Sequence, residues 1–288
     1  MVDTTAMTAP ERPPARWRAA LRQPLTFIGV LLMAIHLILA LFAPVMAPYS
    51  ISAIFTDGLT APSTEHWMGT DQIGRDYLSR LMSGGRIALL VSVIGVAAAV
   101  AVGTALGLVA GYFGGWIDDA VMRLTDTLMS VPELLLIAIL VLTFGKDLAA
   151  LSLIVAIVYT PGVIRVIRAR AISIAALDFV RAAELRGEAT AYILFREIAP
   201  NLTGLLAVEV AIRISSAVLK ISALSFLGLG ISQPTPDWGL MVQEAMVVVF
   251  TDAWFLILPS IALSSLIIGI NFTVDGFARA YGISQLEP

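Results

Sequence analysis

Four polar side chains recur along one apolar stretch and could form a polar site inside a membrane. Glu209, Arg213, Ser216 and Lys220 lie within the stretch 202–229, and on a helix with 3.6 residues per turn they would fall within about 60° of one another. Charged groups at bilayer depth are costly and usually face a cavity or a partner charge. The stripe therefore predicts one of two arrangements. Either it lines a polar path for a charged solute, or Glu209 and Arg213, one turn apart, neutralise each other at a helix contact.

A second informative segment spans residues 178–201 and has the sequence DFVRAAELRGEATAYILFREIAPN. Asp178 is a suitable N-cap and Gly187 a suitable C′ residue, so the segment predicts a helix of about two turns between them. We expect small or apolar side chains on its exposed surface, namely Phe179, Ala182, Ala183 and Leu185. Such a helix suits insertion into a groove on a cytoplasmic partner; the alternative is a solvated connector whose arginines only set orientation.

Small residues recur every fourth position in another apolar stretch, at Gly95, Ala99, Gly103, Gly107 and Gly111. On a helix they form a flat ridge that another backbone can approach closely. The ridge predicts a packed bundle, in which it serves either as a sliding or dimerising face or as a static helix contact.

The composition indicates that the elements carrying these residues cross a membrane. Of 288 residues, 58% are hydrophobic and 14% charged, whereas soluble domains are about 45–50% apolar and about 25% charged. We therefore predict an all-α polytopic membrane protein with six transmembrane helices of about 17–25 residues. The predicted spans are 25–47, 87–112, 128–144, 148–167, 202–229 and 254–274.

The placement of the cations predicts the orientation of these spans. With the N-terminus inside, the cations outside the spans lie mostly on the inner side, and those left outside are Arg75, Arg80, Arg86 and Lys146. Both termini are therefore expected in the cytoplasm. Apolar residues at helical spacing also predict two further helices on the outer side, at 71–86 and 238–250.

Several activities are excluded by missing motifs. The sequence contains no GxxxxGK[ST], HExxH or GxSxG motif and no cysteine, so it provides no phosphate-binding P-loop, zincin site, hydrolase elbow or thiol nucleophile. The net charge of −3 gives no support for nucleic-acid binding. No catalytic, metal or cofactor site is expected in this chain, and uphill transport would need energy from a partner or an ion gradient.

Three stretches resemble the permeases of ATP-binding-cassette importers, in the dipeptide/oligopeptide/nickel branch. The family's cytoplasmic EAA–x3–G–x9–I–x–LP segment is matched by Ala182, Ala183, Gly187 and Pro200; Arg181, Glu197 and Ala199 depart from it. The Arg-Ala-Ala form is usual in this branch. The other two stretches, HWMGTDQIGRDYLSRLMSGGRIAL (66–89) and SFLGLGISQPTPDWG (225–239), resemble branch segments that follow the first and fifth spans.

This resemblance implies a C-type permease of the type I importer fold in a bacterial inner membrane. The implied partners are a second permease in a heterodimer, two ATP-binding subunits that hold ATP and Mg, an extracytoplasmic solute-binding protein, and a peptide substrate. The helix near 179–186 would be the coupling helix, moved by the ATPases, with Asp178 and Arg181 among its contact residues.

The predicted organisation is a cytoplasmic tail 1–24, a first helix and outer segment 25–84, a transmembrane domain 85–280 with a coupling loop 168–200, and a tail 281–288. Two alternatives stay open: an ion-coupled secondary transporter, in which Glu209 and Arg213 form the ion site, and the same permease role with nickel or glutathione as cargo.

Overall fold

The computed structural model describes residues 20–56 and 58–281, and this part of the chain contains helices but no β-strand. The predicted tails 1–24 and 281–288 lie outside the described residues except for 20–24 and Tyr281. The helices are α2 (Pro24–Met46), α3 (Tyr77–Ser83), α4 (Gly85–Phe113), α5 (Gly115–Met129), α6 (Glu133–Phe144), α7 (Leu148–Ala175), α8 (Asp178–Leu185), α9 (Thr190–Tyr192), α10 (Thr203–Phe226), α11 (Trp238–Ala245) and α12 (Trp254–Tyr281). A π-helical turn (Ile193–Ile198) and a 3₁₀ turn (Ala199–Leu202) join α9 to α10.

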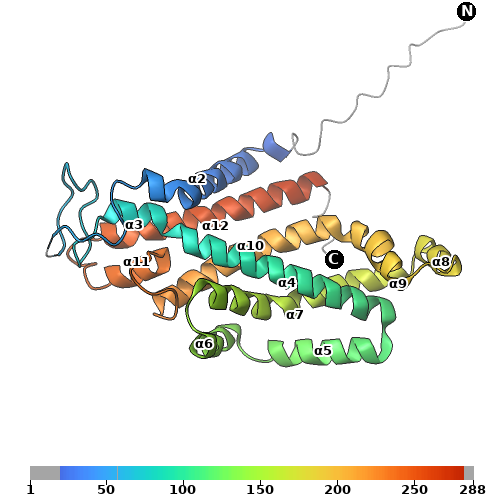
Figure 1. Cartoon of the computed structure of the whole chain (residues 1–288). Coiled ribbons are helices and arrows are strands. Elements are labelled where there is room, and N and C mark those ends of the chain that lie inside the picture. Colours follow the sequence, from blue (N-terminus) through green and yellow to red (C-terminus); the bar gives the residue numbers. More distant parts are fainter. Residues whose placement is uncertain (1–19, 57, 282–288) are drawn as a thin grey trace, which may run out of the picture.

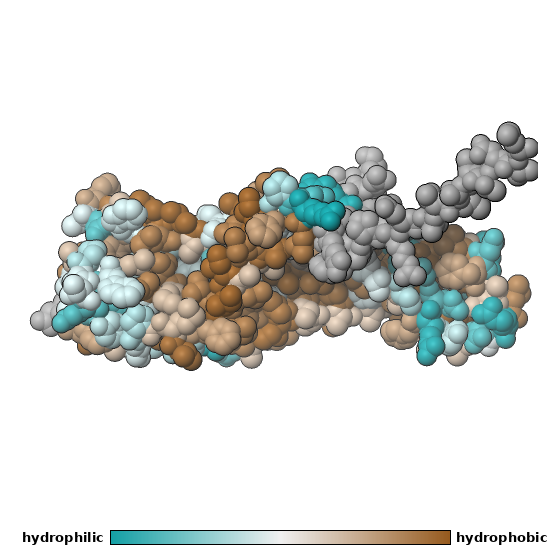
Figure 2. All heavy atoms as spheres, turned by 90° about the horizontal axis from the view of Figure 1, so that it is seen from above, coloured by the Kyte–Doolittle hydropathy of each residue, from teal (hydrophilic) through white to brown (hydrophobic). Residues whose placement is uncertain are grey.

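The all-α, multi-span architecture predicted from the composition is confirmed. In the described part of the chain, five helical segments are long and apolar enough to cross a membrane, or six if the bent pair α5 and α6 forms one span. The helices form an elongated bundle (Figure 1). In the view of Figure 2, an apolar surface band lies between two more polar ends, as expected for a protein surrounded by lipid.

The predicted third span, 128–144, is wrong as a single helix. The chain breaks between α5 and α6, and the axes of the two helices differ by 89°. Pro132 is the cause, because proline has no N–H to donate and disfavours a helical conformation at the preceding residue. Pro132 occupies the N-cap position of α6, with Glu133 as the first residue of that helix.

The glycine ridge packs α4 against α7 of the same chain. A Cβ atom added at Gly95 would come within 2.5 Å of Val155 Cβ, and one added at Gly103 within 2.6 Å of Val163 Cβ. One added at Gly111 would come within 2.7 Å of Ala171 Cβ. The two backbones can approach this closely because the ridge carries no side chains. As a result, α7 is held in a fixed register along α4, and its other surface is free to form the wall of a cavity.

The two ends of the bundle differ in structure. The segment 47–76 lies with α3 and α11 at one end, whereas α8 and α9 lie at the other, toward which the start of α2 and the end of α12 also point (Figure 1). One buried apolar cluster lies between α4, α7, α10, α11 and α12 and includes Trp238 and Leu224. The other lies beneath α8 and includes Ile167, Ile193 and Ile198.

Candidate functional site

The polar stripe of α10 lines a cavity in the middle of the bundle. Glu209, Arg213, Ser216 and Lys220 face a space of about 540 Å³ whose other walls are the break between α5 and α6 and the middle of α7. Pro132 therefore shapes this cavity, because the bend it causes turns α6 away from α5. Gly162 of α7 also leaves room, since a Cβ there would lie 2.8 Å from Arg213 Nη1.

Every charge in this cavity is paired. Arg213 Nη2 lies 2.6 Å from Glu209 Oε2 within α10, and Lys220 Nζ donates a hydrogen bond to Glu133 Oε1 of α6. We call these four residues the cavity charges. Glu209 and Arg213 therefore neutralise each other, as in the second arrangement considered for the stripe, and the same side chains face the cavity; the path for a charged solute stays a prediction.

An aromatic residue of α7 organises the centre of the cavity. The Tyr159 hydroxyl donates to Ser216 Oγ over 3.0 Å. The ring of Tyr159 lies 4.8 Å from Lys220 Nζ and 5.9 Å from Arg213 Cζ, within the range of cation–π attraction. Tyr159 thus holds both cations toward the cavity. Tyr159 and Glu133 could not be assigned to this site from the sequence, because no local pattern connects them to α10.

Two further ion pairs continue the polar surface between α5 and α7. Arg168 forms a two-pronged pair with Asp118, and Arg165 Nη2 lies 2.5 Å from Asp126 Oδ1. These pairs were also missed. The charges of α5 recur at three- and four-residue spacing, and this pattern could have predicted that α5 has one polar face.

The short helix α8 starts and ends close to its predicted boundaries. The prediction that Asp178 caps it is wrong: Leu177 occupies the N-cap position and Asp178 is the first helical residue, where its negative charge still favours the helix N-terminus. Gly187 has φ +76°. The N–H of Gly187 donates to Glu184 O over 2.9 Å and that of Glu188 to Ala183 O over 3.2 Å, which is the Schellman motif that a C′ glycine favours.

One side of α8 is buried and the other is exposed, and this corrects one expectation. Val180 and Ala183 are fully buried in the apolar cluster beneath α8. The prediction that Ala183 lies on the exposed surface is therefore wrong. Phe179, Arg181, Ala182 and Leu185 are exposed, and Leu185 is 91% exposed. Tyr112 of α4 donates a hydrogen bond of 2.8 Å to Glu184, and Pro200 lies in the 3₁₀ turn. The helix therefore rests on the bundle through one side and presents apolar groups on the other.

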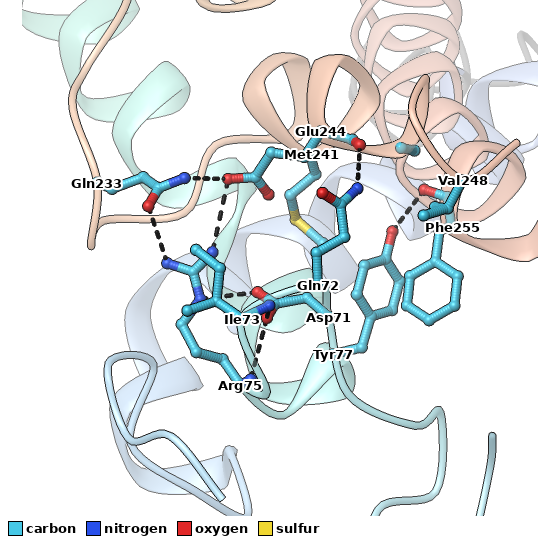
Figure 3. Close-up of a pocket in the computed structure, with 11 residues that line it drawn as sticks. Asp71, Gln72, Ile73, Arg75, Tyr77, Gln233, Met241, Glu244, Val248 and Phe255 are labelled. Atoms are coloured by element: carbon cyan, nitrogen blue, oxygen red, sulfur yellow. Dashed lines mark hydrogen bonds and ion pairs between the residues drawn. The ribbon is translucent and has the colours of Figure 1, made fainter. Parts of the chain in front are cut away.

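At the opposite end, a second group of charges links the segment 66–80 to α11. Arg80 is fully buried; it contacts Asp71, and its Nη1 lies 2.9 Å from Glu244 Oε2. Arg75 Nε donates to Asp71 Oδ2 over 2.7 Å. We call Asp71, Arg75, Arg80 and Glu244 the outer clamp. In Figure 3, Glu244 and Gln233 approach Arg75 from above, next to a small cavity of about 70 Å³.

Hydrogen bonds at Asp71 explain why this carboxylate stays charged although it is buried. Burial acts to raise its pKa, but donation from the backbone N–H of Arg75, the nearby charge of Arg80 and the side chain of Arg75 outweigh it. The pKa of Asp71 therefore lies below its ordinary value. Asp71 is thus a charged carboxylate inside the protein.

The two helices predicted on the outer side are shorter than expected. Instead of 71–86, α3 begins at Tyr77 because the Asp76 carboxylate accepts a hydrogen bond of 2.8 Å from Ser79 N and caps it. Instead of 238–250, α11 ends at Ala245. The Asp237 carboxylate caps α11 by accepting from Gly239 N over 2.8 Å.

The stretches 66–89 and 225–239 meet around a tryptophan. The Trp238 indole donates to Leu81 O over 2.9 Å, and its ring lies against Gly84 and Gly85, where a Cβ would collide with it. Burial raises the pKa of Asp237, the residue before it, to about 6. Two stretches that are far apart in the sequence therefore form one structural unit.

The comparisons with known proteins agree with the predicted family. Residues 103–282 match the family described as binding-protein-dependent transport system inner membrane component. The dipeptide transport system permease protein DppC of Alkalihalophilus pseudofirmus is 33% identical, over 92% of this chain and 88% of the relative. The glutathione transport system permease protein GsiD of Pectobacterium atrosepticum is 34% identical, with the same two coverages. The di/tripeptide transport system permease protein DppC of Pseudomonas aeruginosa is 36% identical, over 88% of this chain and 86% of the relative.

These matches cover most of the chain, and the family match includes the four cavity charges. They do not favour the ion-coupled secondary transporter considered above. The chain therefore belongs to the family of binding-protein-dependent transport system inner membrane components, and it is a multi-pass permease subunit of an ATP-binding-cassette transport system.

Proposed function

We propose that this chain forms half of the translocation pathway of an ATP-driven importer of short peptides. The observation that carries the proposal is the cavity in the middle of the bundle, in which two acidic and two basic side chains surround a space of about 540 Å³. A peptide at neutral pH carries charges of both signs, and each would meet an opposite charge there. The names of the relatives, which include dipeptide, di/tripeptide and glutathione permeases, support the same class of cargo.

The energy for transport would come from two ATP-binding subunits that hold ATP and Mg. We propose that α8 is the coupling helix that docks on one of them, because its exposed side carries Phe179 and Leu185 although it lies at a polar end of the bundle. The opposite side of α8 packs on the bundle through Val180 and Ala183. A push on α8 would therefore move the helices beneath it as a rigid body.

The remaining partners follow from the same proposal. A second permease subunit would close the open side of the cavity in a heterodimer, and an extracytoplasmic solute-binding protein would deliver the peptide at the end that carries the outer clamp. Both termini would then lie in the cytoplasm of a bacterium. The distribution of cations supports this orientation, and so do the start of α2 and the end of α12, which point toward the α8 end (Figure 1).

Uptake by a strain that lacks the gene tests the cargo. A deletion strain supplied with the gene should accumulate labelled di- and tripeptides, and the strain without it should not. Uptake of a nickel chelate or of glutathione alone, without other peptides, would replace the short-peptide proposal with one of the two alternative cargoes.

A substitution on α8 tests the coupling role. Leu185→Asp places a charge in the proposed docking groove and should weaken co-purification of the ATP-binding subunits by at least about tenfold, because an unpaired buried charge is costly. Membrane insertion and assembly with the second permease should be unchanged, since Leu185 is 91% exposed and supports no packing in this chain. Normal co-purification together with normal uptake would refute the docking role of α8.

A further inference from the structure

The two ion pairs of the cavity differ in where their partners come from. Glu209 and Arg213 both belong to α10 and lie one turn apart, so their pairing is local. Glu133 and Lys220 come from α6 and α10, and they meet only because of the break before α6. Separating this second pair requires no change in either helix, only rotation of two side chains.

The two pairs also differ in the exposure of their side chains. The side chains of Glu209 and Arg213 are 16% and 15% exposed, whereas those of Glu133 and Lys220 are 41% and 25% exposed. A pair with this much contact with solvent gains little net free energy from its attraction. It can therefore be replaced by other charged groups at low cost.

Lys220 would keep its position if Glu133 moved away. The ring of Tyr159 lies 4.8 Å from its ammonium group, and the Tyr159 hydroxyl is itself held by Ser216. The cation would consequently stay directed into the cavity by cation–π attraction. Glu133, at the start of α6, would stay next to the positive end of that helix.

A solute with one free ammonium and one free carboxylate has the chemistry to replace this pair. Its carboxylate would bind Lys220 while its ammonium would bind Glu133, so that no charge is left unpaired at any point of the exchange. A solute with only one charge, or with none, would leave at least one of the two side chains without a new partner. The side chain left over would then have only water as its partner, whereas a zwitterion provides a charged partner for each.

We propose that Glu133 and Lys220 form an exchangeable ion pair that opens to bind the free amino and carboxyl ends of a peptide as it passes. This inference rests on the proposed function, and it adds a basis for selecting zwitterionic peptides inside the permease. The pair Glu209–Arg213 stays closed throughout and keeps α10 neutral at that depth.

Cysteine labelling tests the exchange without relying on the binding protein. Because the chain contains no cysteine, Ser130→Cys introduces a single thiol into the cavity wall without touching Tyr159, Glu133 or Lys220. The assembled transporter, purified with its partner subunits, is treated with a thiol reagent, and labelling of this chain is followed by mass. Alanyl-alanine should slow the labelling, and N-acetyl-alanyl-alanine amide, which lacks both charged ends, should not.

Removal of the pair should abolish this protection. In Glu133→Gln/Lys220→Met, the concentration of alanyl-alanine needed for half-protection should rise by about tenfold or more, since both charge-assisted hydrogen bonds to the peptide are lost. The reversed pair Glu133→Lys/Lys220→Glu should retain protection, because the peptide can bind in the opposite direction. Glu209→Gln/Arg213→Met, a matched removal of the other pair, should also retain it.

The possible outcomes separate this inference from the function on which it rests. Three outcomes would each overturn the exchange: equal protection by the capped peptide, unchanged protection in Glu133→Gln/Lys220→Met, or no protection by alanyl-alanine in a transporter that still takes up peptides. Absence of uptake of any peptide by the assembled transporter would instead overturn the proposed function.

Discussion

The outer clamp and the cavity charges contain the same chemistry, two carboxylates with two cations, in two different environments. In the clamp, Arg80 is fully buried and Arg75 nearly so. The clamp residue Glu244 is 21% exposed, close to the 16% and 15% of Glu209 and Arg213 in the cavity. The contrast is carried by Glu133 and Lys220, which are 41% and 25% exposed. Burial decides what an ion pair can do: a buried pair cannot be broken without leaving a charge unsolvated, whereas a half-exposed pair can exchange its partners. The clamp therefore holds the outer segments together, and the cavity is free to interact with a solute.

The largest expected effect comes from breaking the clamp. Arg80→Met should leave Asp71 and Glu244 with only Arg75 between them, one cation for two carboxylates, and lower the free energy of unfolding by about 3–5 kcal/mol. Thermal unfolding of the purified transporter measures this loss. Arg86→Met, which removes an exposed arginine from the adjacent helix, serves as the control and should change stability by less than about 0.5 kcal/mol. Equal effects of the two substitutions would contradict the structural role of the clamp.

An intermediate effect on stability, dependent on pH, is expected from the buried carboxylate of Asp237 at the start of α11. Because the pKa of Asp237 is raised to about 6 from 3.8, the folded protein retains a proton that the unfolded chain releases. The free energy of unfolding should therefore fall as the pH rises from about 4 to about 6, by up to about 3 kcal/mol.

Asp237→Asn should remove this pH dependence while keeping the helix cap, since asparagine caps as well as aspartate. The midpoint of thermal unfolding at pH 5 and pH 7.5 measures the difference between variant and unmodified protein. The control is Asp147→Asn at the exposed N-cap of α7, which should leave the pH dependence as it was. A decrease in stability at pH 7.5 in Asp237→Asn would show that the charge of Asp237 is needed.

The smallest effect on stability is expected in the cavity. Lys220→Met should lower the free energy of unfolding by no more than about 1 kcal/mol, because Glu133 is 41% exposed and can be solvated without its partner. The same unfolding measurement used for Arg80→Met tests this value. A loss as large as that of Arg80→Met would mean that the cavity pair is structural and would remove the contrast between the two regions.

Several parts of this fold could be predicted because they depend on residues close in sequence. The long apolar stretches, the ridge from Gly95 to Gly111 and the end of α8 at Gly187 all follow from local periodicity or local backbone preference. The exposure of Ala183 was mispredicted because one side of a two-turn helix cannot be assigned without knowing what lies beneath it. The helix across 128–144 was mispredicted because its high hydropathy concealed the effect of Pro132.

The candidate site was predictable only in part. The stripe on α10 could be identified because one helix determines the relative directions of its own side chains. Its partners could not, since Glu133 lies 87 positions from Lys220 and Tyr159 lies 57 positions from Ser216. The same holds for the outer clamp, in which Arg80 and Glu244 are 164 positions apart.

By itself, the sequence determined that this chain crosses a membrane, which of its helical surfaces are polar, and which family it resembles, because hydropathy, spacing and motifs are properties of neighbouring residues. Only the tertiary structure decided which charges meet and how deeply each pair is buried. The physical reason is that the strength of an ion pair depends on its distance from solvent, which is set by helices packed from distant parts of the chain. That difference in burial separates a clamp from a cavity that can exchange charges with its cargo.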